Sequence, residues 1–340
     1  MIIQLEKPTL RRKDMDAVLQ TMADEKIGPG ALTSTFVSLL TQTMGKYPYV
    51  HALRDRFHAL RFALMAIGVG EGSVVGTDVL SPRFYRDVLA SLGAHIQLYD
   101  IEVDTGTVSF DALVGQELTA LIICDHYGNI PPDRGWDSLG IPIIEDITES
   151  FGSSYGGMKA GDVGDVVVCA FEESCVVSTA GGAAVMTNDD GIGSLLASYI
   201  DPLHSVIALP SMNAALGVVQ LQQLEKNLQK RRAIFDKYRY ALMKSRHSMF
   251  GIRDLDFDTN GHGFVVVLDS KPSQAIQFAL RYEVDTALAF DDTLIGDAID
   301  RFDLFPNAIP CVTRGVRFPL YPFLGIQQIL QIEKVISHLP

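Results

Sequence analysis

Polar side chains with acid–base capacity follow two apolar runs of the chain, Leu121–Cys124 and Ile141–Ile144. His126 comes just after the first run, and Asp146 and Glu149 follow the second. Because open α/β sheets bind ligands beyond the carboxyl ends of their strands, these three side chains are predicted to face one cleft. For His126 we prefer the simpler interpretation, a packed or hydrogen-bonded loop histidine. For Asp146 the simpler interpretation is a strand-end turn, and we prefer the site position.

Cys175 is the candidate nucleophile of the chain. A thiol reacts as its thiolate, so it needs a cation or a helix terminus to lower its pKa from about 8.5. Glu172 and Glu173 lie just before it and would raise that pKa instead. We therefore favour an inert thiol, with cysteine chemistry using His126 as the base as an alternative. No metal site is expected, since no CxxC pair or zinc-type Cys/His spacing occurs among Cys124, Cys169 and Cys311.

Short β-rich runs alternate with helical patterns between Phe57 and Asp190. Several runs are apolar at successive positions, which indicates strands covered on both faces. Such strands are typical of a mostly parallel sheet wrapped by helices. The expected strands are Val74–Gly76, Ile96–Tyr99, Leu121–Cys124, Ile141–Ile144, Val166–Phe171 and Ala183–Met186, with helices at Leu60–Ile67 and Tyr85–Leu92.

A long amphipathic helix is predicted over Met212–Lys244. After it the pattern changes to α+β, with strands at Gly263–Leu268 and Val316–Pro319 and helices at Pro272–Tyr282 and Ile326–His338. Because the chain has no repeat and no low-complexity linker, this change of element type sets the domain limits. We expect an N-terminal arm and large α/β domain over 1–210, a bridging helix over 211–245 and a small C-terminal α+β domain over 246–340.

The segment Ile144–Tyr155, continuing through Gly157 and Gly161 to Gly164-Asp165, resembles the cofactor-base segment of the DegT-type sugar aminotransferases. That family shares the fold-type I aminotransferase architecture. Further stretches resemble the family in the same order along the chain, so the resemblance covers nearly all of it. They include Gly28-Pro29-Gly30, Leu64–Gly72, Tyr127-Gly128, Ala214–Gly217 and Phe318–Pro322.

The resemblance implies a mostly parallel seven-stranded sheet and a pyridoxal phosphate site. In such enzymes a carboxylate keeps the pyridinium nitrogen protonated, and a lysine holds the cofactor as an imine. Asp146 stands at the carboxylate position, and Glu149 stands where the family contacts the ring hydroxyl. The resemblance also implies a homodimer, or a heterodimer with an active relative, and a nucleotide-sugar ligand in amino-sugar or polysaccharide biosynthesis.

The position of the family's cofactor-binding lysine departs from the family pattern. One anchoring of the alignment places Cys175 there, and another places Ser174. Neither side chain carries the primary amine that an imine requires. Transamination through this position is therefore chemically excluded.

The residues expected around the cofactor phosphate and ring depart as well. The helix start that cups the phosphate is normally small and rich in donors, whereas this chain has Asp55-Arg56-Phe57, in which only Arg56 offers a compensating cation. Other departures are Pro82 at the stacking aromatic, Ala170 at a phosphate-binding serine, and Val206–Leu209 at residues that reach the neighbouring subunit. This joint loss indicates abandonment of the cofactor.

Two functions therefore compete. The first is a non-transaminating homologue that binds a ligand or a partner, with no cofactor expected. The second is an aminotransferase-like or dehydratase-like enzyme that holds pyridoxal phosphate non-covalently through Asp146 and Glu149, with Arg56 at the phosphate.

Charge and hydropathy exclude other classes. The net charge of −13 argues against a nucleic-acid partner, because phosphate backbones attract clusters of Lys and Arg. The N-terminal segment reaches Lys7 and Arg11 too early for a signal peptide, and no apolar run is long enough to cross a bilayer. A cytoplasmic location is expected.

Overall fold

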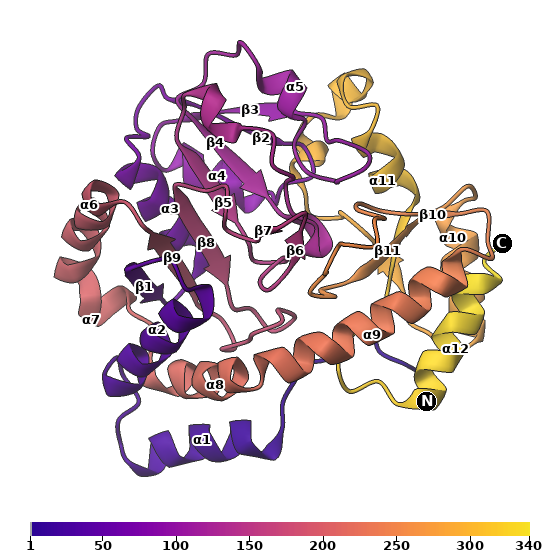
Figure 1. The fold of residues 1–340 in the computed structure, drawn as a ribbon, viewed down its shortest axis with the longest axis horizontal. Coiled ribbons are helices and arrows are strands. Elements are labelled where there is room, and N and C mark those ends of the chain that lie inside the picture. The colour runs from indigo at the N-terminus through magenta and orange to yellow at the C-terminus, as the bar shows by residue number, and fades with distance from the viewer. Residues whose placement is uncertain (1) are drawn as a thin grey trace.

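The computed structural model describes residues 2–340, in which a large α/β domain and a smaller α+β domain are joined by two consecutive helices (Figure 1). The large sheet has seven strands in the order β1-β9-β8-β5-β4-β2-β3. Four of its neighbouring pairs are parallel, and β9 runs antiparallel to both neighbours, so the predicted fold class is confirmed. The strands are β1 (Tyr49–Leu53), β2 (Val74–Asp78), β3 (His95–Tyr99), β4 (Ala120–Cys124), β5 (Ile143–Asp146), β8 (Val166–Ala170) and β9 (Ala183–Thr187).

Helices cover both faces of this sheet because its central strands are apolar on both sides. In β8, Val166 and Val168 join a core with α3 (Arg56–Ala66), α4 (Phe84–Ala90) and α6 (Asp190–Ile200). Val167 and Cys169 face the opposite core, with α2 (Ala31–Met44) and α8 (Ser211–Gln222). This two-residue alternation is the strand period, and it explains why the run reads as continuously apolar.

The predicted single bridging helix is in fact two helices. α8 ends at Gln222, and α9 (Leu224–Leu242) begins after Gln223, whose φ of −105° and ψ of 2° interrupt the helical path. α8 packs on the large domain against α1 (Arg12–Ala23) and α2, whereas α9 carries the chain to the small domain. The break comes without a proline or glycine, so no residue type marks its position.

The small domain is built on a four-stranded antiparallel sheet in the order β10-β11-β13-β12. Its core packs this sheet against α9, α10 (Pro272–Arg281) and α12 (Ile326–Ser337). The N-terminal segment lies along the same domain, since Ile3 exchanges backbone hydrogen bonds with Glu283 and Asp285. The small-domain strands are β10 (Ser248–Met249), β11 (Phe264–Val267), β12 (Ala287–Leu288) and β13 (Gly315–Phe318), and the remaining elements include α5 (Phe110–Leu113), β6 (Ser154–Tyr155), β7 (Met158–Lys159), α7 (His204–Ile207) and α11 (Ala308–Arg314).

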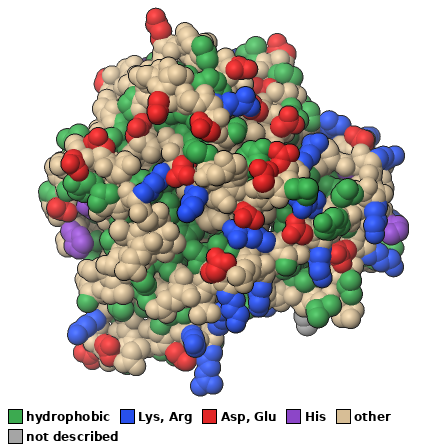
Figure 2. Space-filling model, viewed as in Figure 1, with side chains coloured by type: hydrophobic (Ala, Val, Ile, Leu, Met, Phe, Trp, Pro, Cys, Tyr) green, Lys and Arg blue, Asp and Glu red, His purple; other side chains and the backbone are tan. Residues whose placement is uncertain are grey.

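Acidic and basic side chains are interspersed on the face that Figure 2 shows. Among the helices of residues 2–340, none is long and apolar enough to cross a membrane.

Candidate active-site cavity

A cavity of about 220 Å³ lies beyond the carboxyl ends of the parallel strands β2, β4 and β5, where open α/β sheets bind ligands. The small domain closes it with the segment 290–293 and with Arg317 of β13. We call this space the strand-end cavity. Its lining residues are Arg56, Leu80, Pro82, Phe84, Cys124, His126, Tyr127, Asp146, Thr148, Glu149, Phe290, Asp291, Asp292, Thr293 and Arg317.

Asp146 is the last residue of β5, and its carboxylate is held rigidly at the cavity wall. Oδ2 accepts a hydrogen bond from the Tyr85 hydroxyl at 2.7 Å, and Oδ1 accepts from the Thr148 amide at 3.0 Å and from the Thr148 hydroxyl. Burial raises the pKa of Asp146 and these donors lower it, with a net upward shift. The strand end thus presents a fixed acceptor toward the cavity.

His126 follows β4 and is buried with a carboxylate of its own. Its Nε2 lies 2.8 Å from Oδ1 of Asp78, the last residue of β2. Phe290 packs edge-on against the ring, with 5.8 Å between centroids. Burial lowers the pKa of His126, but Asp78 and the neighbouring carboxylates outweigh burial, so the net shift is upward. The hydrogen bond to Asp78 therefore holds the His126 imidazole in one orientation.

Glu149 fixes the backbone between the two domains. Its Oε2 accepts the amide of Tyr127 at 2.7 Å, and its Oε1 lies 3.7 Å from Nε2 of His262. Tyr127 has a φ of 52°, in the left-handed region that residues other than glycine rarely adopt. Because such strain persists only where neighbours hold it, Glu149 is a positioning residue for the Tyr127 loop.

Arg56 opens α3 and lies at the cavity with its guanidinium 4.3 Å from the ring centroid of Phe84. The preceding residue, Asp55, caps the helix by accepting the amide of His58 at 2.8 Å. The Asp55 carboxylate also contacts the His58 ring nitrogen Nδ1 at 2.9 Å. A negative charge of the protein itself therefore occupies the helix N-terminus, where an anion would otherwise bind.

Cys175 does not line the strand-end cavity. It lies in the loop between β8 and β9 with 5% of its surface exposed, and burial raises the pKa of its thiol to about 12. The thiol is therefore protonated at neutral pH. The His126 side chain is hydrogen-bonded to Asp78. Among residues 2–340, no hydrogen bond joins Cys175 to His126, as a nucleophile and its base would require.

Four predicted site residues, Arg56, His126, Asp146 and Glu149, thus line one cavity, and Cys175 lies outside it. The contacts from distant segments could not be predicted from the sequence. Asp78 of β2 is hydrogen-bonded to His126, and Tyr85 of α4 donates to Asp146. The small domain completes the cavity with Asp291, Asp292 and Arg317. Of these residues only Asp78 had a possible signal, because it follows the expected strand Val74–Gly76 by two residues.

The cavity only partly fits pyridoxal phosphate. Asp146 is a suitable partner for a ring nitrogen, and the space is large enough for a small ring. No lysine, however, occurs among the lining residues that the structure describes, and the Asp55 carboxylate caps the helix where the phosphate would bind. These residues do not fit a covalently held cofactor.

Comparison with known proteins places this geometry in context. The DegT/DnrJ/EryC1/StrS aminotransferase family matches residues 8–202 and 203–337. A GDP-perosamine synthase of Escherichia coli is 24% identical over 303 residues, which span 82% of each chain.

Solved structures show the same fold. A putative sugar aminotransferase from Streptococcus pneumoniae, in its PMP form, superposes with a TM-score of 0.88 at 18% identity, over 99% of this chain and 97% of that one. A GDP-4-keto-6-deoxymannose-3-dehydratase with a trapped PLP-glutamate geminal diamine superposes with a TM-score of 0.85 at 15% identity, over 98% of this chain and 99% of that one. At these identities the similarity establishes the architecture alone.

Proposed function

The chain belongs to the DegT/DnrJ/EryC1/StrS aminotransferase family, and we propose that it is a member that binds a nucleotide-sugar or a protein partner without transaminating through a lysine imine. The main support is that no lysine occurs among the lining residues that the structure describes. The resemblance adds that either Cys175, a buried thiol, or Ser174 stands at the position of the family's lysine. An imine needs a primary amine. A family fold hosts many chemistries, so the site decides the function.

The strand-end cavity supports small-molecule binding. It combines apolar walls from Leu80, Phe84 and Phe290 with the cations of Arg56 and Arg317. A sugar ring offers hydroxyls to the carboxylates of Asp146, Glu149 and Asp291, and a diphosphate offers charge to the two arginines. The GDP-linked sugar of the Escherichia coli relative makes this ligand class the natural first choice.

The second candidate is an enzyme that holds pyridoxal phosphate without a covalent bond. Asp146 supports this candidate, because its carboxylate is shielded from bulk solvent, lines the cavity and is oriented by Tyr85 and Thr148. The dehydratase among the structural neighbours, whose structure contains a PLP-glutamate adduct, supports it as well. In this case the cofactor would supply the electron sink, and Asp146 would hold the proton on its ring nitrogen.

Calorimetry separates the two candidates. We expect a GDP-linked sugar to bind the wild-type chain and to bind Arg56→Gln more weakly, while pyridoxal and pyridoxamine phosphate release no binding heat. Pyridoxal phosphate binding that disappears in Asp146→Asn would favour the second candidate. A visible absorbance band of an imine, together with transfer of an amino group to a keto sugar, would overturn the first candidate.

Assembly and location complete the proposal. The family resemblance and the commonness of isologous pairs support a homodimer, or a heterodimer with an active relative, in amino-sugar biosynthesis in the cytoplasm.

A further inference from the structure

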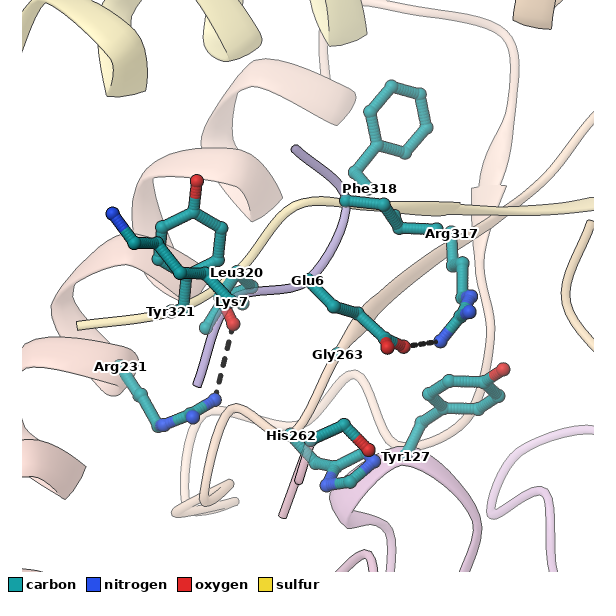
Figure 3. A pocket seen from close by; sticks show the side chains of 12 residues that line it. Glu6, Lys7, Tyr127, Arg231, His262, Gly263, Arg317, Phe318, Leu320 and Tyr321 are labelled. Atoms are coloured by element: carbon teal, nitrogen blue, oxygen red, sulfur yellow. Dashed lines mark hydrogen bonds and ion pairs between the residues drawn. The ribbon is translucent and has the colours of Figure 1, made fainter. Parts of the chain in front are cut away.

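The basic side chains of α9 differ in role along the helix. Arg231 is buried, points inward and donates to the carbonyl of Leu320 at 3.2 Å (Figure 3). Arg232 donates to the carbonyls of Thr259 and Gly152, each at 3.0 Å. These two cations therefore serve the fold, because they join the helix to neighbouring segments.

A second set of cations lies from the last turns of α9 to the loop after β10. Residues 237–253 contain five Lys and Arg and no Asp or Glu, whereas the whole chain has a net charge of −13. The acids that flank this segment are Asp236, which forms an ion pair with Arg239 at 3.1 Å, and Asp254 and Asp256. The other four cations are exposed and form no ion pair with any of residues 2–340. They are Lys237, Lys244, Arg246 and Arg253.

Apolar side chains accompany these cations around a hollow of about 410 Å³. Three large ones line the hollow and are nevertheless mostly exposed: Tyr240 at 60%, Met243 at 76% and Leu255 at 88%. Lys237 precedes Tyr240 by three residues, close to one turn of α9, so this cation lies beside them. We call these three apolar residues, together with the four exposed cations, the basic-apolar face.

The apolar content distinguishes this face from an ordinary solvated helix end. Large apolar side chains that are exposed singly need no explanation, but these three stand around one concave space. Figure 2 shows basic side chains around apolar ones over the small domain, at the right of the view. Lys and Arg beside Leu, Met and Tyr are typical of surfaces that lie in a membrane interface.

Charge and shape decide among the possible occupants. A second copy in a two-fold pair would set like charges against each other, and a nucleic acid would leave the apolar side chains in water. A bilayer with anionic lipid matches both features, because its headgroups attract Lys and Arg and its interface takes up apolar side chains. Met243 and Leu255 keep most of their surface outside the hollow, which suits a fluid interface better than a fitted protein surface. Acidic groups elsewhere on the chain are screened beyond about 10 Å at about 0.1 M salt.

We propose that the basic-apolar face is a peripheral membrane-binding site, which places Met243 and Leu255 among the headgroups of an anionic bilayer and the four exposed cations against lipid phosphates. The site goes beyond the proposed function, because none of the residues that line its hollow lines the strand-end cavity. Only side chains enter the interface, so the binding is reversible and depends on salt.

Co-sedimentation of the full chain with vesicles tests the proposal. The vesicles contain phosphatidylcholine alone, or phosphatidylcholine with about one third phosphatidylglycerol as the anionic lipid. We expect binding to the anionic vesicles that weakens several-fold when salt rises from about 0.1 to about 0.5 M, and no measurable binding to the neutral ones. A chain that ignores the anionic vesicles, or binds both kinds equally, would overturn the proposal. The first result would leave an acidic protein segment as the occupant of this face.

Charge variants assign the binding to the basic-apolar face. The double variant Lys244→Gln/Arg246→Gln should bind anionic vesicles at least about tenfold more weakly, because each cation near an anionic surface contributes about fivefold. Lys226→Gln/Lys230→Gln is the matched control, since it removes two exposed charges from the same helix at least about 15 Å from Tyr240. Equal losses in the two double variants would contradict the assignment.

An apolar variant separates insertion from charge attraction alone. Leu255→Asn should weaken binding to anionic vesicles by about fivefold or more, because the interface no longer takes up this side chain. Leu255 is almost fully exposed, so the exchange leaves the fold intact. Leu195→Asn, on α6 of the large domain, is the control and should bind like wild type. Unchanged binding in Leu255→Asn would refute insertion at this face, whatever the strand-end cavity binds.

Discussion

Single residues at strand ends decide what this molecule can do chemically. Asp146, His126 and Glu149 stand after apolar runs, so their placement at one cavity could be predicted from strand polarity alone. Their partners could not, because Asp78 and Tyr85 are brought to them by the sheet order and by α4 rather than by nearness in sequence. The burial of Arg231 was equally hidden, since a helical arginine normally reaches solvent.

The Tyr85 hydroxyl stabilises the buried Asp146 carboxylate. Tyr85→Phe should lower the free energy of unfolding by about 1–3 kcal/mol, because it leaves a buried charged acceptor short of a donor. Urea unfolding measures the loss. Tyr49→Phe removes a similar bond to Asp190 at the surface and should change stability by less than about 0.5 kcal/mol. Equal effects of the two variants would contradict this account.

Asp125 couples stability to pH. It is fully buried beside Glu145, and burial raises the pKa of Asp125 well above its ordinary value. Its protonated form therefore favours the folded state, and that contribution is lost as pH rises from about 4, the unfolded pKa, toward the folded pKa. Asp125→Asn cannot ionise, so its stability relative to wild type should increase from pH 5 to pH 8. Urea unfolding at both values would refute this if the difference stays constant or shrinks.

Regular elements were largely predictable, whereas their interruptions were not. The apolar runs located β2, β3, β4, β5, β8 and β9 to within a few residues, because strands that are covered on both faces leave a strong signal. The edge strand β1 (Tyr49–Leu53) carries too weak a pattern to be recognised, and the break at Gln223 has no sequence signature. The left-handed turn at Tyr127 is imposed by Glu149 from the following strand end.

The N-terminus of α3 belongs to this scale, because its anion-binding capacity depends on the cap. Asp55→Ser keeps a capping hydroxyl and removes the carboxylate, so the terminus should attract a phosphate more strongly. We expect inorganic phosphate to bind Asp55→Ser about two- to fivefold more tightly than wild type, by the usual size of a charge–dipole effect. Calorimetric titration checks it, and unchanged or weaker binding would show that Asp55 does not block the site.

At the scale of the whole molecule, the family architecture is retained. Two domains meet across the strand-end cavity, and both supply its walls. The sequence could assign the fold because the cofactor-base segment is distinctive. It could not show the closure by the small domain, since residues 290–293 and Arg317 lie far from that segment along the chain.

Assembly is tested at the same scale. Several apolar side chains are exposed on and after α1, including Met15, Leu19, Met22 and Ile27, beside a hollow of about 700 Å³ between α1, α2 and α8. Such a patch marks a protein interface, so we expect a homodimer by sedimentation velocity and dissociation in Leu19→Glu. Leu330→Glu, on α12, is the control and should leave the dimer intact. A monomeric wild type would contradict the expectation.

We infer that the strand-end cavity offers no amine to a pyridoxal ring. Incubation with pyridoxal phosphate, reduction with borohydride and intact-mass measurement test it directly. We expect no stoichiometric adduct and only scattered labelling of surface lysines. One pyridoxyl group per chain, mapped by peptide analysis to a single lysine that enters the cavity, would contradict it.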